Sequence, residues 1–93
     1  MVEFKHVNGK GGNKVVLYAL STCGWCKKVK NLLNSLGIAY DYIDIDQIDE
    51  KTSDELDAIV RKWNPAGTYP TIVVDNKRAI ISYEEEKIKE LAE

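Results

Sequence analysis

Two cysteines, Cys23 and Cys26, are the only ones in the chain, and two residues separate them. An apolar run over residues 15–20 comes directly before this pair, and a helical pattern of apolar residues follows over 27–36. This order predicts a strand that delivers Cys23 to the first turn of a helix. A helix N-terminus has unpaired N–H groups and a partial positive charge, which favour a thiolate over a thiol. The pattern therefore predicts a strand followed directly by a helix, with a reactive dithiol at the junction.

The size and composition are those of an ordinary globular protein. A chain of 93 residues is long enough to form one domain with a modest core. Its content of 44% hydrophobic and 30% charged residues is typical of a folded protein. A net charge of −2 gives no reason to expect nucleic acid or an anionic membrane as a partner. The N-terminus has no long apolar segment, and no run approaches the length of a membrane span. We therefore expect a cytoplasmic monomer with no nucleic-acid or membrane partner.

The spacing of the cysteines argues against a purely structural disulfide. In a reducing cytosol, a close cysteine pair is more typical of catalysis or metal binding than of a covalent staple. A bridge between Cys23 and Cys26 would also close a very short loop, so it would remove little entropy from the unfolded chain.

Zinc is the main alternative for such a pair. A structural zinc site needs four ligands, and the chain has one histidine, His6, besides the two cysteines. His6 lies on an alternating segment, residues 2–7, which predicts a short half-buried strand with His6 facing solvent. We therefore expect no metal site.

A glycine-rich segment follows this first strand. Residues 8–13 predict a turn that folds the chain back into a hairpin with residues 14–20. A phosphate-binding loop would end in Lys-Ser/Thr and lead into a helix, whereas this segment leads into a strand.

The helix after the cysteines should end at Gly37, in the position that favours glycine after a helix. Its inward stripe has i, i+3, i+4, i+7 spacing and contains Val29, Leu32, Leu33 and Leu36. Residues 38–46, rich in Tyr and Ile, predict the next strand.

The second helix is predicted to open at Thr52, with Glu55 completing a capping box, and to end at residues 64–67. Its inward face would contain Leu56, Ile59, Val60 and Trp63.

The last third of the chain predicts a hairpin and a short helix. Residues 71–74 and 78–81 read as strands around a turn, and residues 84–91 as a helix with Ile88 and Leu91 facing inward. The order is β-α-β-α-β-β-α with an extra strand in front. Crossover helices make the first strands parallel, and the closing hairpin adds antiparallel ones, so the sheet should be mixed.

The motif Thr68-Tyr69-Pro70 stands directly before the strand at 71–74. Together with the Cys-x-x-Cys and the order of elements, it resembles the glutaredoxins over about residues 14–92. The resemblance implies an α/β thioredoxin-like fold, a mixed four-stranded sheet with an extra N-terminal strand and helices on both faces. It makes residues 1–93 a single glutaredoxin-like domain, in which 1–13 can form an N-terminal hairpin extension.

The resemblance also implies a substrate site. In the family the proline bond is cis and places backbone opposite the dithiol, so Thr68, Tyr69 and Pro70 are expected to form a docking wall. The acidic pair that holds the glutathione ammonium corresponds to Glu84 and Glu85.

Several positions differ from the family pattern. Gly24 and Trp25 stand between the cysteines, where proline and tyrosine are usual. Leu20 stands where glutathione-using members carry a carboxylate-binding lysine, and Leu17 where thioredoxins carry a buried acid. The usual Gly-Gly is absent from the region of residues 80–82. These differences predict poor use of glutathione.

Cys23 is expected to be the nucleophile, near the helix N-cap and partly exposed, with the amides of Trp25 and Cys26 toward its sulfur. Lys27 and Lys28 would add positive potential. Cys26, one turn deeper, is expected to be buried, to keep a higher pKa and to resolve the mixed disulfide. Gly24 and Trp25 would lie at the rim, where Trp25 is a platform for the substrate or a shield for the sulfurs.

The predicted function is that of a dithiol–disulfide oxidoreductase, an enzyme of electron transport and cell redox homeostasis. It would reduce protein disulfides or low-molecular-weight mixed disulfides. No cofactor is expected beyond the redox-active disulfide itself, and electrons would come from a small thiol or a reductase of unknown type. Two alternatives are a dimeric iron–sulfur cluster carrier and a thiol-binding module without turnover.

Overall fold

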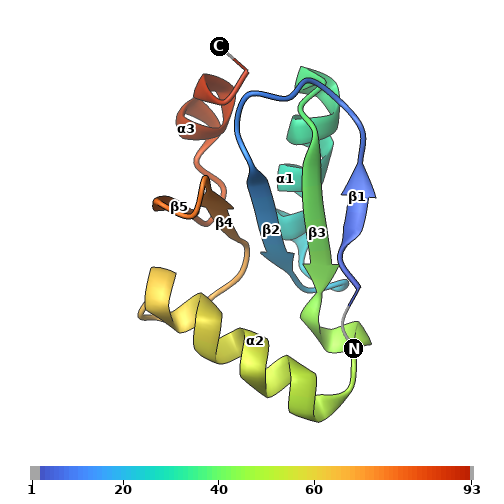
Figure 1. The fold of residues 1–93 in the computed structure, drawn as a ribbon, viewed down its shortest axis with the longest axis vertical. Coiled ribbons are helices and arrows are strands. Elements are labelled where there is room, and N and C mark those ends of the chain that lie inside the picture. The colour runs from blue at the N-terminus through green and yellow to red at the C-terminus, as the bar shows by residue number, and fades with distance from the viewer. Residues whose placement is uncertain (1–2, 93) are drawn as a thin grey trace.

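The computed structural model describes residues 3–92. Within this range, five strands, three α-helices and one 3₁₀ turn follow one another (Figure 1). In order they are β1 (Lys5–Val7), β2 (Val15–Ala19), α1 (Gly24–Leu36), β3 (Tyr40–Asp44), the 3₁₀ turn η1 (Ile45–Gln47), α2 (Glu50–Trp63), β4 (Thr71–Val74), β5 (Arg78–Ile81) and α3 (Glu85–Glu90).

The strands form one mixed sheet in the order β1-β3-β2-β4-β5. β2 and β3 are parallel, because α1 crosses over between them, and the other neighbours are antiparallel. The predicted mixed sheet with an extra N-terminal strand is therefore confirmed. The predicted bounds of β4 and β5 are also confirmed, whereas the third strand is shorter than predicted, because the chain turns into η1 at Ile45.

The predicted hairpin between the first strand and residues 14–20 is wrong. β1 pairs with β3, with His6 opposite Asp41, because β3 and β4 occupy both edges of β2. His6 is exposed, as predicted, and its Nδ1 lies 2.7 Å from Asp41 Oδ1. The glycine-rich segment instead passes over the end of the sheet, where Lys10 bridges to Ile38. Val2, the first residue of the predicted N-terminal strand, lies outside the described residues.

Gly9 explains how this segment can pass so close to the sheet. A Cβ atom at residue 9 would lie 2.5 Å from the carbonyl oxygen of Gly37 and 2.6 Å from the amide nitrogen of Ala39. We expect Gly9→Ala to lower the free energy of unfolding by about 1–3 kcal/mol, because a backbone contact cannot move aside easily. Gly11→Ala is the matched control, since a Cβ there meets nothing within 4 Å. Equal urea midpoints for the two variants would contradict this explanation.

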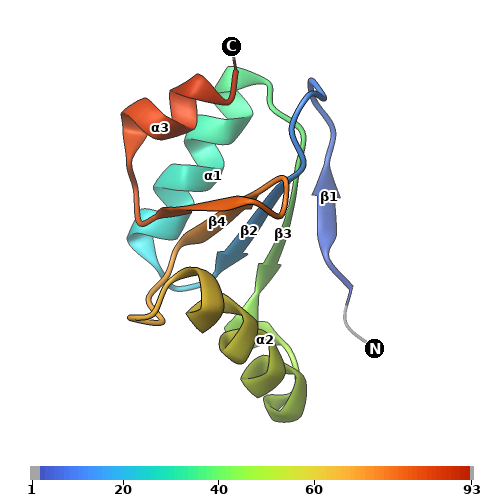
Figure 2. The same cartoon turned by 60° about the vertical axis from the view of Figure 1, so that its left-hand side comes forward.

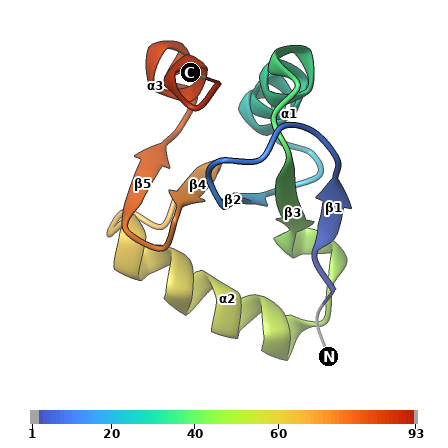
Figure 3. The same ribbon diagram turned by 45° about the horizontal axis from the view of Figure 1, so that its top comes forward.

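Helices cover both faces of the sheet, as the sequence predicts. α1 and α3 lie together on one face and α2 lies on the other (Figures 2 and 3). The α1–α3 side holds the larger core, which includes Leu17, Val29, Leu33, Ile72 and Ile88. The α2 side holds a smaller one, with Tyr18, Ile43, Leu56, Val60 and Val73.

The buried face predicted for α1 is confirmed, most clearly for two of its four residues. Val29 and Leu33 are fully buried, and Leu32 and Leu36 pack partly buried against the same core. Gly37 ends the helix with a φ of 70°, and its N–H donates to the carbonyl of Asn34.

Two details of α2 differ from the prediction. Asp49, not Thr52, is the N-cap: its carboxylate accepts hydrogen bonds from the backbone N–H and the hydroxyl of Thr52. Ile59 was expected to face inward but is 38% exposed, because the buried face of the helix runs through Leu56 and Val60. Trp63 packs partly buried against the smaller core, and Ile88 and Leu91 of the last segment are buried as predicted.

Within residues 3–92, none of the helices has the length and the hydrophobicity needed to cross a membrane.

Candidate active site

Cys23 lies at the N-cap of α1, directly after the turn that follows β2. Its side chain is partly exposed, and the backbone N–H of Cys26 donates to its sulfur over 3.1 Å. Of the two amides expected at the sulfur, it is that of Cys26 that makes the hydrogen bond. A charge-assisted bond of this kind strengthens when Cys23 is a thiolate. The local sequence therefore places one sulfur where a negative charge is stabilised by the helix terminus.

Cys26 is the buried partner. It has no exposed surface and belongs to the core between the sheet and α1. Burial, and then the hydrogen bond with Cys23, raise the pKa of Cys26 to about 12. Cys26 is buried, as predicted, and its pKa is shifted in the expected direction. Both cysteines are free thiols in this structure.

The loop before β4 forms a wall beside the dithiol. The sulfur of Cys23 lies 4.0 Å from the carbonyl oxygen of Tyr69, and the Tyr69–Pro70 bond is cis, as predicted. Pro70 is buried, and Thr68 is exposed. The structure thus brings the Thr68-Tyr69-Pro70 motif against the Cys-x-x-Cys motif, although 46 residues separate Tyr69 from Cys23.

Asn64 anchors this wall, a role that its sequence context did not predict. The side chain is 2% exposed, and its Nδ2 donates toward the carbonyl and hydroxyl of Thr68 and the hydroxyl of Thr71, over 3.0–3.2 Å. Its Oδ1 accepts from the backbone N–H of Ala66. A buried amide with both ends satisfied fixes the loop on the end of α2.

A second anchor holds the Tyr69 side chain from the exposed surface of α2. The Tyr69 hydroxyl donates to Asp57 Oδ1 over 2.9 Å, and Arg61 Nε donates to Asp57 Oδ2 over 2.9 Å. The bonds from Arg61 and Tyr69 lower the pKa of Asp57, and burial and the bond to Asp57 raise the pKa of Tyr69. Asp57 and Arg61 were also missed, although their i, i+4 spacing was a visible signal of a pair on one helix face.

Hydrogen bonds also hold the loop on the other side of Cys23. Asp46, at the 3₁₀ turn after β3, accepts from the backbone N–H and the hydroxyl of Ser21, and Gln47 Nε2 donates to the same hydroxyl. The side-chain bond from Ser21, followed by its backbone bond, lowers the pKa of Asp46 to about 2. Asp46 therefore remains a carboxylate at neutral pH and holds the turn that leads to Cys23.

Aromatic side chains line the rim, as predicted for Trp25. Trp25 is 55% exposed, and its ring lies 5.8 Å from that of Tyr83, centroid to centroid. The ammonium of Lys28 lies 4.6 Å from the Trp25 ring centroid, within cation–π range. Beside Trp25, Gly24 opens the helix with nothing within 4 Å of where a Cβ would stand. One edge of the site is thus exposed and apolar, with a positive charge beside it.

The remaining predicted residues are less directly connected to the sulfurs. Lys27 is exposed, and its hydrogen bond to Cys23 runs through the backbone. Glu84 and Glu85 follow Tyr83 and form ion pairs with Lys87 and Lys89, each 2.9 Å long. Glu85 also accepts a hydrogen bond from the Tyr83 hydroxyl, which links the start of α3 to the aromatic rim.

For the part of the chain that the structure describes, no three His, Cys, Asp or Glu side chains gather where they could hold a metal ion.

A thiol at the start of a helix, a second thiol behind it and a proline loop beside them are the arrangement of the thioredoxin-like fold. The sequence profile described as Glutaredoxin matches residues 15–79. The chain therefore belongs to the glutaredoxin family, whose members are thiol–disulfide oxidoreductases.

Individual relatives agree with this assignment. The chain is 30% identical to a glutaredoxin of Solanum lycopersicum over 66 residues, 71% of this chain and 59% of that protein. It spans less than two thirds of the length of that relative.

Among solved structures, a glutaredoxin from Methanosarcina mazei is 39% identical with a TM-score of 0.88, over 96% of this chain and 86% of that one. Methanosarcina acetivorans methanoredoxin is 37% identical with a TM-score of 0.81, over 85% and 83%.

Proposed function

We propose that this protein is a dithiol–disulfide oxidoreductase that reduces protein disulfides or low-molecular-weight mixed disulfides. The observation that carries the proposal is the contrast between the two thiols. Cys23 is partly exposed at a helix N-terminus and accepts the Cys26 N–H, while Cys26 is fully buried. One sulfur can therefore meet a substrate, and the other can be reached only from inside the site.

The reaction proceeds in two exchanges. The Cys23 thiolate attacks a substrate disulfide, so that a Cys23–substrate disulfide forms and the first substrate thiolate leaves. Cys26 then attacks the Cys23 sulfur, the second substrate thiol leaves, and the Cys23–Cys26 disulfide remains. Two electrons pass from the dithiol to the substrate, and the electron supply is a small thiol or a reductase. The two sulfurs carry these electrons, so we propose no resident cofactor.

The substrate would dock along the wall of Thr68, Tyr69 and Pro70. The carbonyl of Tyr69 faces the Cys23 sulfur at 4.0 Å, so the backbone of an incoming cysteine peptide can pair with this edge as a short added strand. Trp25 would support the same peptide from the opposite rim. Lys27 would attract anionic groups, and Glu84 and Glu85 would meet an ammonium group.

Poor use of glutathione is expected, because Leu20 stands where a lysine would bind the carboxylate of that tripeptide. Leu20 is partly exposed and packs at the edge of the smaller core, so a lysine there can extend its ammonium to solvent. An exposed charge pair contributes about 0.5–1 kcal/mol to binding, so Leu20→Lys should lower the apparent KM for glutathione several-fold. A glutathione-coupled assay measures this. Robust glutathione turnover by the unmodified protein would contradict the expectation.

The function itself is tested by supplying electron donors to the oxidised protein. Glutathione, a second small thiol, thioredoxin reductase with NADPH, and a ferredoxin-linked reductase are offered in turn, and reduction of a protein disulfide is measured. Turnover with any one of them supports the proposal. A protein that is coloured after anaerobic purification and inactive with all of them would indicate an iron–sulfur carrier, and a colourless inactive one a binding module.

The chemistry suits a reducing compartment, and we propose the cytoplasm. One chain supplies both cysteines and the docking wall, so turnover is proposed for the monomer.

A further inference from the structure

The proposed two-step reaction does not explain how Cys26, the resolving thiol, becomes a thiolate. Cys26 must lose its proton to attack, yet burial raises the pKa of this thiol well above neutral pH. A backbone hydrogen bond at Leu20 and the positive charge of Lys30 act in the opposite direction and lower the pKa of Cys26. Lys30 stands four residues after Cys26 on α1, and therefore on the same side of the helix.

Lys30 is held in place by Asp44, at the end of β3. Lys30 Nζ lies 2.9 Å from Asp44 Oδ1, and the two side chains are 21% and 17% exposed. The lysine and arginine side chains of the other ion pairs in the described residues are 47–59% exposed. Removing a charged pair from water has a large desolvation cost, so such a pair is weak evidence for a purely stabilising role.

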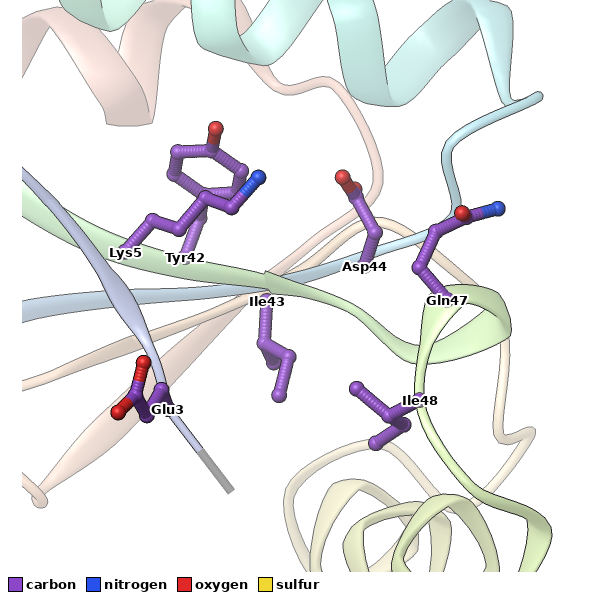
Figure 4. Close-up of a pocket in the computed structure, with 7 residues that line it drawn as sticks. All are labelled: Glu3, Lys5, Tyr42, Ile43, Asp44, Gln47 and Ile48. Atoms are coloured by element: carbon purple, nitrogen blue, oxygen red, sulfur yellow. The ribbon is translucent and has the colours of Figure 1, made fainter. Parts of the chain in front are cut away.

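The surroundings orient the ammonium further. Lys30 Nζ lies 4.4 Å from the centroid of the Tyr42 ring. Tyr42 and Asp44 project from β3 toward the α1 side, whereas Ile43 projects to the other side (Figure 4). Tyr42, Asp44 and Gln47 also line an open pocket of about 520 Å³ at this edge of the sheet. Asp44, the ion-pair partner of Lys30, therefore borders a pocket that water can enter.

We propose that Lys30, positioned by Asp44, activates Cys26 for the resolving step, an inference that rests on the proposed function. As the Cys26 S–H bond breaks, the ammonium of Lys30 stabilises the thiolate. That thiolate forms the Cys26–Cys23 bond, the bond between Cys23 and the substrate sulfur breaks, and the substrate leaves as a thiolate. The proton released by Cys26 passes through water to that leaving thiolate, so Lys30 and Asp44 both end the step as they began it.

Other ionisable groups near Cys26 do not supply this charge. Cys23 is in disulfide linkage to the substrate during resolution and is therefore neutral. The remaining ionisable side chains that belong to the Cys26 core or pack against it are the phenols of Tyr40, Tyr42, Tyr69 and Tyr83, from β3, the docking wall and the segment before α3. Lys30 is the cation whose charge acts on the Cys26 thiol.

The test separates the two exchanges with the chromogenic disulfide dithiobis-nitrobenzoate. Attack by Cys23 releases one coloured thiolate, and resolution by Cys26 releases a second, so rapid mixing gives one phase for each step. We expect Lys30→Met to slow the second phase about tenfold at neutral pH, which corresponds to one pKa unit of thiolate. The first phase should be unchanged, Lys30→Arg should restore the second phase, and the deficit should shrink as the pH rises.

Two further variants keep the result interpretable. Lys30→Met leaves the Asp44 carboxylate unpaired, so the double variant Lys30→Met with Asp44→Asn serves if the single variant fails to fold. Lys62→Met removes an exposed positive charge on α2 and should change neither phase. An unchanged second phase in the folded variants, or equal slowing of both phases, would overturn the role of Lys30. Absence of both phases in the unmodified protein would instead overturn the proposed function.

Discussion

Cys23→Ser should abolish disulfide reduction, with a loss on the order of a thousandfold or more, because it removes the proposed nucleophile. Cys26→Ser should instead retain the first exchange and accumulate a Cys23–substrate disulfide, since nothing remains to resolve it. Mass spectrometry of the protein after mixing with a protein disulfide detects that adduct. The single-thiol variant should also keep some turnover when a small thiol can replace Cys26 as the resolving group.

Alkylation of the reduced protein provides an independent measurement of the same assignment. Cys26 is fully buried, and its pKa is raised to about 12, so it holds its proton through the neutral range. Iodoacetamide at mildly acidic pH should therefore label Cys23 first, and Cys26 should react only at strongly alkaline pH or after unfolding. Labelling of Cys26 before Cys23 would reverse the assignment of roles.

The elements that could be predicted from sequence are those whose signals are local. The end of α1 at Gly37 could be predicted, because the left-handed backbone conformation that follows a helix depends on one residue and its immediate neighbours. The strands at 71–74 and 78–81 are apolar runs around a short turn, and both have the predicted bounds. The placement of Cys23 at the junction of a strand and a helix follows from the apolar run before it and the helical pattern after it.

The errors concern relations between distant segments. The glycine-rich segment does reverse the chain, yet β1 pairs with β3, and this choice depends on which strands already flank β2. The start of α2 was misplaced for a different reason: Thr52 with Glu55 and Asp49 with Thr52 are both acceptable caps. The structure selects Asp49, whose carboxylate bonds to Thr52.

The proposed docking wall shows that contacts between distant segments could not be predicted at the site either. Its location was predicted from the Thr68-Tyr69-Pro70 motif, but its anchors were not. Asp57 reads as an ordinary exposed helix residue, and its bond to the Tyr69 hydroxyl becomes visible only when α2 and the loop are placed side by side. Asn64 carried a weak signal, since an asparagine before Pro65 at the end of a helix is typical of a turn.

Asn64→Ala is expected to have the largest effect on stability among substitutions near the wall. The change removes a buried amide that bonds to Thr68, Thr71 and Ala66, and leaves the backbone N–H of Ala66 and the hydroxyl of Thr68 without this partner. Losing a buried hydrogen-bonded group of this kind costs about 1–3 kcal/mol of the free energy of unfolding. Urea denaturation measures the loss. Asn31→Ala, at an exposed position of α1, is the matched control and should leave the midpoint within error.

The same substitution should separate docking from chemistry, because Asn64 touches the wall and neither sulfur. A wall displaced by a fraction of an ångström should lower turnover with a protein disulfide about tenfold, since the incoming strand is misaligned with Cys23. The first exchange with dithiobis-nitrobenzoate should change less, because that small disulfide needs no pairing with Tyr69. Assays are run below the unfolding transition of the variant, so that both rates refer to folded protein. If both substrates lose the same factor, Asn64 supports the fold as a whole and not the docking wall.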